Sequence, residues 1–172
     1  MSEPELALTA AGYDHPDAVR LIAELQAVYV ARYGGIDATP LDPAEFAAPG
    51  GYFVLGYVQG AAVACGGWRA RDADPVDPEL RDGDAEIKRM YVVPAHRGRG
   101  IARVVLAELE RSAAAAGRRR MVLETGDRQP EAVALYTSSG YRPVPTFGSY
   151  RTEPGCRCFG KHIAHGAQVF TS

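Results

Sequence analysis

The sequence of 172 residues predicts a single mixed α/β domain. Two observations predict this class. In the first half, the β-rich runs 52–58 and 61–69 are separated only by Gln59-Gly60, which is the spacing of a β-hairpin. In the second half, strand and helix patterns alternate from residue 85 onward, an order typical of strands connected by helices. No internal repeat or linker interrupts residues 1–172, so we expect one domain.

Composition excludes several functional classes. The chain is 47% hydrophobic and 23% charged, as is usual for a globular protein, and its net charge is −2. This charge argues against a general nucleic-acid or membrane-surface binder. No apolar run approaches the ~18 residues of a membrane span, and the acidic N-terminus lacks the pattern of a secretory signal. We therefore expect a cytoplasmic protein without nucleic-acid or membrane partners.

The first elements follow from short-range patterns. Residues 6–10 form an apolar run suited to a first strand. Residues 14–32 carry apolar side chains at helical spacing, with Asp14 as the expected N-cap and Gly34-Gly35 as the stop. A short second helix is predicted at 41–48, entered through Asp42-Pro43, and a polar, acidic loop at 71–84.

The later elements are more regular. A long strand is predicted at 85–93, and an amphipathic helix at 101–117 ends at Gly117, which suits a C-cap. Its expected apolar face consists of Ile101, Val104, Val105, Leu109 and Ala113. A strand at 119–125 and a helix at 130–139 follow, and 141–144 and 156–162 close the fold. Residues 163–172 show no pattern and are expected to form a flexible tail.

The cysteines give no strong signal. Cys65, Cys156 and Cys158 are an odd set in a chain without an export signal, which argues against a disulfide framework. Cys156 and Cys158 would share one face of a strand, so a place in the core is favoured over a metal site. We expect no metal.

The most informative stretch is 86–102, where a buried strand reaches Pro94 and a basic glycine turn leads into a helix. Free N–H groups and the helix dipole make such a turn an anion site. A Walker loop requires G-x-x-x-x-G-K-[ST], which is absent, and a Rossmann fingerprint requires glycine where Arg103 stands. Neither of these phosphate loops is therefore present.

The stretch instead resembles the cofactor motif of the GNAT superfamily of acetyl-CoA-dependent N-acetyltransferases. The similarity covers Tyr91-Val92-Val93-Pro94, Arg97-Gly98-Arg99-Gly100-Ile101-Ala102, and the later pairs Leu135-Tyr136 and Gly140-Tyr141. It implies the GNAT fold: a central, mostly antiparallel sheet, splayed at the strand that ends near Pro94 and flanked by about four helices. It also implies acetyl-CoA as co-substrate and, as in many relatives, a homodimer, although no interface can be located.

The resemblance implies which residues bind acetyl-CoA. The pantetheine arm is expected along the backbone near Val92, which also supplies the N–H for the developing oxyanion. The pyrophosphate is expected on the glycine turn, where glycines let the backbone approach and arginines can pair with phosphate. Gln129 stands where the family usually has asparagine. The expected contacts are Tyr91, Val92, Val93, Arg97, Gly98, Arg99, Gly100, Ile101, Ala102, Arg103 and Gln129.

Two catalytic residues follow from the same resemblance. Tyr136 is implied as the donor to the departing CoA thiolate, since a tyrosine of pKa near ~10 can protonate a thiolate of conjugate pKa near ~8.5. The alternative is a core tyrosine that packs at helical spacing. Glu86 lies at the spacing of the general base in the histone-acetylating branch. Its alternative role is an ion pair with Lys88 or Arg69, and Glu124 is the rival carboxylate.

The acceptor is less defined. Aromatic side chains expected beside the thioester are Tyr29, Tyr33, Trp68, Phe147 and Tyr150. We expect direct attack by a small-molecule primary amine in a ternary complex. Cys65 as an acyl-enzyme nucleophile is poorly supported, because no histidine is placed to activate it. A protein or peptide acetyltransferase and a non-catalytic acetyl-CoA-binding module remain as alternatives.

Overall fold

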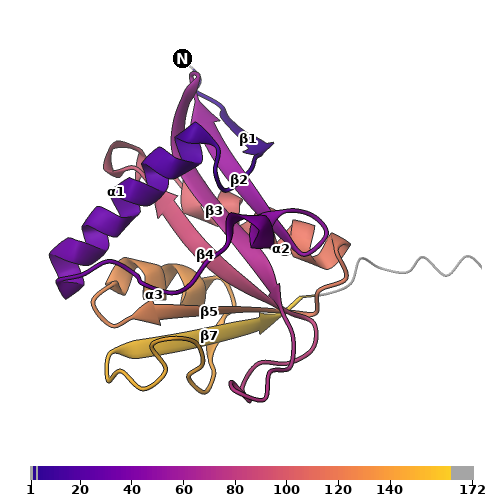
Figure 1. The fold of residues 1–172 in the computed structure, drawn as a ribbon. Coiled ribbons are helices and arrows are strands. Elements are labelled where there is room, and N and C mark those ends of the chain that lie inside the picture. The colour runs from indigo at the N-terminus through magenta and orange to yellow at the C-terminus, as the bar shows by residue number, and fades with distance from the viewer. Residues whose placement is uncertain (1, 3, 164–172) are drawn as a thin grey trace, which may run out of the picture.

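The computed structural model describes residues 2 and 4–163, which build a seven-stranded sheet of order β1-β2-β3-β4-β5-β7-β6 (Figure 1). All neighbouring strands are antiparallel except β4 and β5. The strands are β1 (Leu6–Ala10), β2 (Gly51–Val58), β3 (Ala61–Arg71), β4 (Asp84–Val92), β5 (Arg120–Gly126), β6 (Arg142–Pro143) and β7 (Cys156–His162). The predicted mixed fold with a mostly antiparallel sheet is confirmed. The insertion of β7 between β5 and β6 was not predicted.

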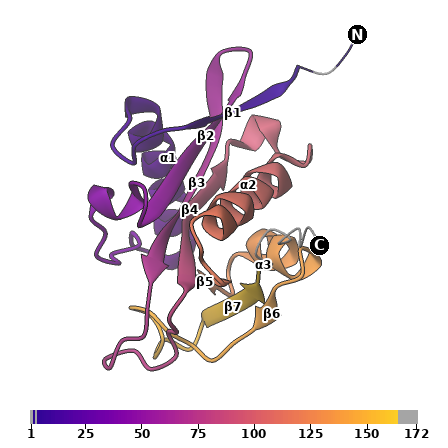
Figure 2. The same ribbon diagram turned by 90° about the vertical axis from the view of Figure 1, so that its right-hand side faces the viewer.

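Helices cover both faces of this sheet. In Figure 2, α1 (Pro16–Tyr33) lies on one side, and α2 (Ile101–Ala115) and α3 (Pro130–Ser138) lie on the other. The side chains agree, because α1 joins one apolar cluster and α2 and α3 join a second. None of the helices in the described part of the chain is long and apolar enough to cross a membrane.

The expected helix count was about four, and residues 2 and 4–163 contain three α-helices with two short 3-10 turns. The helix predicted at 41–48 is only the turn η1 (Pro43–Phe46). Asp42 and Glu45 form a capping box at its start, so the entry signal was correct. Only four residues separate this cap from the break at Ala47, where the backbone becomes extended.

The start of α1 differs from the prediction by one residue. The N-cap is His15 rather than Asp14, because His15 Nδ1 accepts the N–H of Asp17 at 3.1 Å. Pro16 then occupies the first helical position, where a missing N–H has no cost. At the other end Gly34 adopts the left-handed conformation predicted for a stop, with φ 80°.

β4 and β5 pair over three residue pairs only, from Asp84 with Arg120 to Glu86 with Val122. Beyond these pairs β4 continues to Val92 and β5 to Gly126, and the two strands separate. The predicted splay at the strand that ends near Pro94 is therefore confirmed, and it begins well before Pro94 itself. Pro94 therefore ends β4 in the turn η2 (Pro94–His96), and it does not start the divergence.

A β-bulge lies within the separated part of β4. Arg89 and Met90 together face Gly66 of β3, because the register changes between the pairs Cys65–Tyr91 and Gly67–Lys88. Arg89 has φ 61°, a conformation that few non-glycine residues adopt. Strained residues of this kind cluster at functional sites, and this one lies at the opening between β4 and β5.

The expected tail falls mostly outside the described residues. Of residues 163–172, only Ile163 is described, and its N–H donates to the carbonyl of Arg119 at 3.0 Å. The prediction of a flexible tail therefore stays a prediction for residues 164–172.

Position 104 corrects the predicted apolar face of α2. Val104 is 47% exposed, whereas Val105, Leu106 and Leu109 are buried. The face is therefore rotated toward Leu106 and Ser112, whose hydroxyl accepts the indole N–H of Trp68 at 2.8 Å. The core side of this helix is set by the tryptophan beneath it.

We expect Leu109→Ala to lower the free energy of unfolding by about 2–5 kcal/mol, because it leaves a cavity in a fully buried site. Val104→Ala on the same helix is the control and should change it by less than about 0.5 kcal/mol. Urea unfolding of both variants measures the difference. Equal losses would show that Val104 belongs to the core face.

Candidate active site

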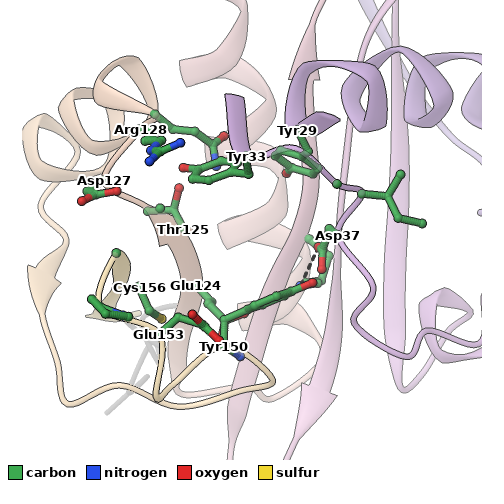
Figure 3. Close-up of a pocket in the computed structure, with 17 residues that line it drawn as sticks. Tyr29, Tyr33, Asp37, Glu124, Thr125, Asp127, Arg128, Tyr150, Glu153 and Cys156 are labelled. Atoms are coloured by element: carbon green, nitrogen blue, oxygen red, sulfur yellow. Dashed lines mark hydrogen bonds and ion pairs between the residues drawn. The ribbon is translucent and has the colours of Figure 1, made fainter. Parts of the chain in front are cut away.

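Three adjoining cavities occupy the opening between β4 and β5. The first, of about 310 Å³, lies along the end of β4 and the start of α2. The second, of about 60 Å³, lies beside the bulge, and the third, of about 580 Å³, lies toward α1 and the loop before β7 (Figure 3). We call them the cofactor cavity, the connecting cavity and the acceptor cavity. Gln129 lines all three, so the cavities adjoin one another around this side chain.

The cofactor cavity ends at a set of free backbone N–H groups. Arg97 N donates to Pro94 and Val104 N donates to Gly100, but the N–H groups between them have no backbone acceptor among the described residues. Gly98 and Gly100 both have φ 77°, a conformation that favours glycine. Gly100 caps α2 without a side chain, so the helix N-terminus is open. This arrangement fits a pyrophosphate.

The arginines of the turn are placed differently from one another. Arg97 lines the cofactor cavity, donates from Nε to the carbonyl of Val92 at 2.9 Å, and lies over the ring of Tyr91. Arg103 lines the same cavity and donates to the hydroxyls of Ser138 and Ser139. Of the predicted contacts, Arg99 and Val93 do not line this cavity. The others do: Tyr91, Val92, Arg97, Gly98, Gly100, Ile101, Ala102, Arg103 and Gln129.

Tyr136 lies at the boundary between the cofactor and connecting cavities, and it lines both. Its ring packs edge-on against Tyr141, with centroids 5.5 Å apart. Burial raises the pKa of its hydroxyl well above the ordinary value, with a smaller contribution from Tyr29. The hydroxyl therefore stays protonated and can act as a hydrogen-bond donor at the end of the cofactor cavity.

Glu86 is enclosed in an ion-pair network. The side chain is almost fully buried, and its Oε1 accepts from Arg69 and Arg71, each at 2.9 Å. Burial acts to raise the pKa of this carboxyl, but Lys88 and the two arginines outweigh it and lower the pKa. Glu86 lines none of the three cavities. This environment argues against Glu86 as a general base and favours its alternative role in ion pairs.

Glu124 has the opposite environment. It lines both the connecting and the acceptor cavity, and no described residue forms an ion pair with it. Its only hydrogen bond to the described residues is a long one, 3.4 Å from the N–H of Tyr150. Burial raises the pKa of its carboxyl to about 7, Lys88 opposes that rise, and Glu86 adds to it. A carboxyl that titrates near neutral pH in a cavity is suited to accept a proton.

Gly148 makes room for this carboxylate. A Cβ at position 148 would lie 2.2 Å from Glu124 Oε2, and the glycine has φ 85°. The backbone conformation therefore favours glycine, and a larger side chain would displace the Glu124 carboxylate. The loop before β7 thus shapes the site around Glu124.

Tyrosines line the acceptor cavity. Tyr29 and Tyr33 come from α1, and Tyr150 comes from the loop before β7 (Figure 3). The Tyr150 hydroxyl accepts the N–H of Ala38 at 2.8 Å, which ties this loop to the segment after α1. The other two aromatic candidates, Trp68 and Phe147, are 1% exposed and belong to the core.

The fold and the cavities can now be compared with known proteins. Residues 19–141 match the model of the Acetyltransferase (GNAT) family, which is well over half of the chain. The chain belongs to the GNAT family. An IAA acetyltransferase of Azospirillum brasilense is 35% identical over 136 residues, which cover 79% of this chain and 84% of that protein.

Solved structures agree. A Klebsiella pneumoniae protein provisionally described as an acyl-CoA N-acyltransferase has a TM-score of 0.75 at 28% identity, covering 92% of this chain and 98% of that one. A GNAT family acetyltransferase from Elizabethkingia anophelis, solved with acetyl-CoA bound, has a TM-score of 0.61 at 14% identity, covering 92% and 98%. The second likeness is one of fold alone. The chain is an acetyl-CoA-dependent acyltransferase of the GNAT family.

This acetyltransferase carries charges at the site that the sequence analysis did not assign. Asp37, from the loop after α1, accepts from Arg89 at 2.6 Å and lies 3.6 Å from Lys88 Nζ. Lys88 and Arg89 are both buried although they are charged residues within a strand. That combination was a visible signal in the sequence, since a strand in the middle of a sheet seldom carries consecutive charges. Asp37 lies in an irregular loop, and the sequence carried no comparable signal for it.

The cysteines of the acetyltransferase lie in the core. Cys156 and Cys158 are buried on one face of β7, with their sulfurs 3.8 Å apart and within 4.8 Å of a Glu124 oxygen. Burial raises the pKa of both thiols, so at neutral pH they carry their protons and are unreactive as nucleophiles. Cys65 lines no cavity, and burial raises the pKa of its thiol to about 12, which does not suit a nucleophile.

Glu124 should make stability depend on pH. Its folded-state pKa of about 7 lies above the ordinary value of 4.5, so the folded state binds the proton more tightly. The free energy of unfolding should then fall as pH rises from about 4.5 to 7. After allowance for partial exposure, the loss should be about 2 kcal/mol.

Glu124→Gln, which cannot ionise, is the matched control. We expect this variant to gain about 2 kcal/mol relative to the wild type between pH 5 and pH 8, as measured by urea unfolding at both values. A difference that does not change with pH would show that the carboxyl is not perturbed.

Proposed function

We propose that this protein transfers the acetyl group of acetyl-CoA to a primary amine of a small molecule, by direct attack in a ternary complex. The observation that carries the proposal is the position of two side chains. Tyr136 and Glu124 face the connecting cavity from opposite ends, one beside the cofactor cavity and the other beside the acceptor cavity. An acid and a base at the two ends of one small space fit a reaction between two bound molecules.

Acetyl-CoA, when bound, supplies an activated acetyl thioester. Glu124 accepts a proton from the acceptor ammonium, because an amine attacks only after it has lost that proton. A base with a pKa of about 7 is poised for this transfer near neutral pH. Glu124 thus takes the role for which Glu86 was the first candidate in the sequence.

The Tyr136 hydroxyl is the proton donor to the sulfur of the departing CoA. Burial keeps the phenol protonated, and its position at the cavity boundary lets it donate when the sulfur departs. Cys65 does not reach the path between the cavities, which favours direct attack over an acyl-enzyme. The N–H groups near Val92 keep their predicted role toward the developing oxyanion.

The shape of the acceptor cavity favours a small molecule over a protein substrate. The hydrogen bond between Tyr150 and Ala38 joins the two segments that border the cavity, whereas an extended peptide requires an open groove. The volume of the acceptor cavity, about 580 Å³, is typical of small-molecule sites. The name of the Azospirillum relative, IAA acetyltransferase, points in the same direction.

The proposal is tested by incubating the protein with acetyl-CoA and a panel of amines, amino acids, polyamines and short peptides, followed by mass spectrometry. We expect one class of small amine to gain an acetyl group. Acetylation of peptides alone would support a protein acetyltransferase. A rise in melting temperature with acetyl-CoA but no acetylated product would support a binding module instead.

Substitution of each carboxylate in turn distinguishes the two candidate bases. Glu124→Gln should lower kcat by about 10²–10⁴-fold without loss of stability at pH 8. Glu86→Gln should instead lower the free energy of unfolding by about 3–5 kcal/mol, because the buried Arg69 and the half-buried Arg71 lose the carboxylate that they share. Steady-state kinetics and urea unfolding of both variants give the answer. Full turnover in Glu124→Gln would remove Glu124 as the base.

Tyr136→Phe should lower kcat by about 10²-fold with little effect on the KM for acetyl-CoA, because the ring remains and only the proton donor is lost. Tyr141→Phe is the matched control. Tyr141 packs against Tyr136 but its hydroxyl donates to Glu110 at 2.9 Å, away from the cavities. An equal loss of kcat in both variants would indicate a packing effect.

A further inference from the structure

Lys88 is a buried cation that is not fully satisfied. Its side chain is 6% exposed, and it lines both the connecting and the acceptor cavity. The ammonium has three N–H donors, yet it donates no hydrogen bond to any of residues 2 and 4–163. A buried charge without hydrogen bonds is costly, so the cavities that Lys88 lines supply its acceptors, from water or from a bound ligand.

The one ion pair of Lys88 does not meet this need. Asp37 Oδ2 lies 3.6 Å from Lys88 Nζ, beyond hydrogen-bond distance. The same oxygen lies 2.6 Å from Arg89, which therefore takes the carboxylate. Asp37 attracts the Lys88 ammonium electrostatically but accepts none of its N–H donors.

Lys88 and Glu124 come from the two strands on either side of the opening. Lys88 comes from β4 and Glu124 from β5, on the two strands that separate after Glu86. Both line the same two cavities, and they form no ion pair with each other. An ammonium with unused N–H donors and a carboxylate without an ion pair among the described residues, beside one cavity, match a ligand that carries both charges close together.

We propose that the acceptor is an α-amino acid or a close analogue, whose carboxylate binds Lys88 while its amine faces Glu124. This inference rests on the proposed function and narrows its substrate. The rest of the acceptor cavity, with Tyr29, Tyr33 and Tyr150, holds the side chain. The carboxylates of Asp127 and Glu153 also line this cavity, but both residues are exposed. Solvent therefore screens their interaction with the charge on the reacting nitrogen.

The wild-type enzyme tests this with matched pairs that differ only in the carboxylate: tyrosine and tyramine, histidine and histamine, arginine and agmatine, and lysine and cadaverine. For the preferred pair, kcat/KM should be about 10- to 100-fold higher for the amino acid, as expected for a charge-assisted hydrogen bond. The methyl ester of that amino acid, which keeps the shape but loses the charge, should behave like the decarboxylated amine.

The variant Lys88→Met then tests whether Lys88 causes the preference for the amino acid. We expect kcat/KM for the amino acid to fall about 10- to 100-fold more than for its decarboxylated partner, mostly through KM, and Lys88→Arg to restore part of the preference. Melting temperature and its shift with acetyl-CoA verify the fold. If Lys88→Met does not fold, the wild-type pairs alone decide.

Two results would overturn the inference. Equal or better acetylation of the decarboxylated amines would show that no carboxylate is recognised, while the proposed transfer to small amines would stand. Equal losses for both members of a pair in Lys88→Met would place Lys88 at the acetyl group instead of the acceptor. Failure of the proposed function itself would differ from both, because no amine would be acetylated.

Discussion

The site depends on one structural constraint: β4 and β5 remain paired over three residue pairs and then separate. Past Glu86 the backbone of β4 has no strand neighbour on that side, and the bulge at Arg89 turns the strand further. The three adjoining cavities lie in this opening, between elements far apart in sequence. In the proposed function, the separation provides both a slot for an extended cofactor and a place where acceptor and thioester can meet.

Charge within the sheet divides into two groups. At the closed end, buried charges are matched: Glu86 with Arg69 and Arg71, and Asp84 with Arg120 at 2.7 Å. Such groups stabilise one arrangement and are not free to react. At the open end, Glu124 and Lys88 stay without hydrogen-bonded partners of opposite charge in the described structure. Incomplete satisfaction beside a cavity, rather than burial alone, is what singles out these two residues.

Local signals predicted the elements well and predicted their faces less well. The hairpin at Gln59-Gly60, the stop at Gly34 and the start of α3 at Pro130 each depend on a residue with a restricted or unusual backbone conformation, which neighbours in sequence decide. Val104 was placed on the wrong face because helical spacing alone allows a rotation of the apolar stripe. The orientation of that stripe on α2 depends on Trp68 of β3, which donates a hydrogen bond to Ser112 of the helix.

By itself, the sequence determined the order of the elements along the chain, the glycine turn before α2 and the placing of a tyrosine at the end of α3, because each follows from contacts over a few residues. The tertiary structure alone decided which carboxylate is free. Glu86 and Glu124 look equivalent in the sequence, as acidic residues on neighbouring strands. Their difference arises from Arg69 and Arg71 of β3, which pair with Glu86 and not with Glu124, and from Gly148, which makes room for Glu124 at the cavity. Long-range packing sets the electrostatic environment of a charged side chain, and no local pattern encodes it.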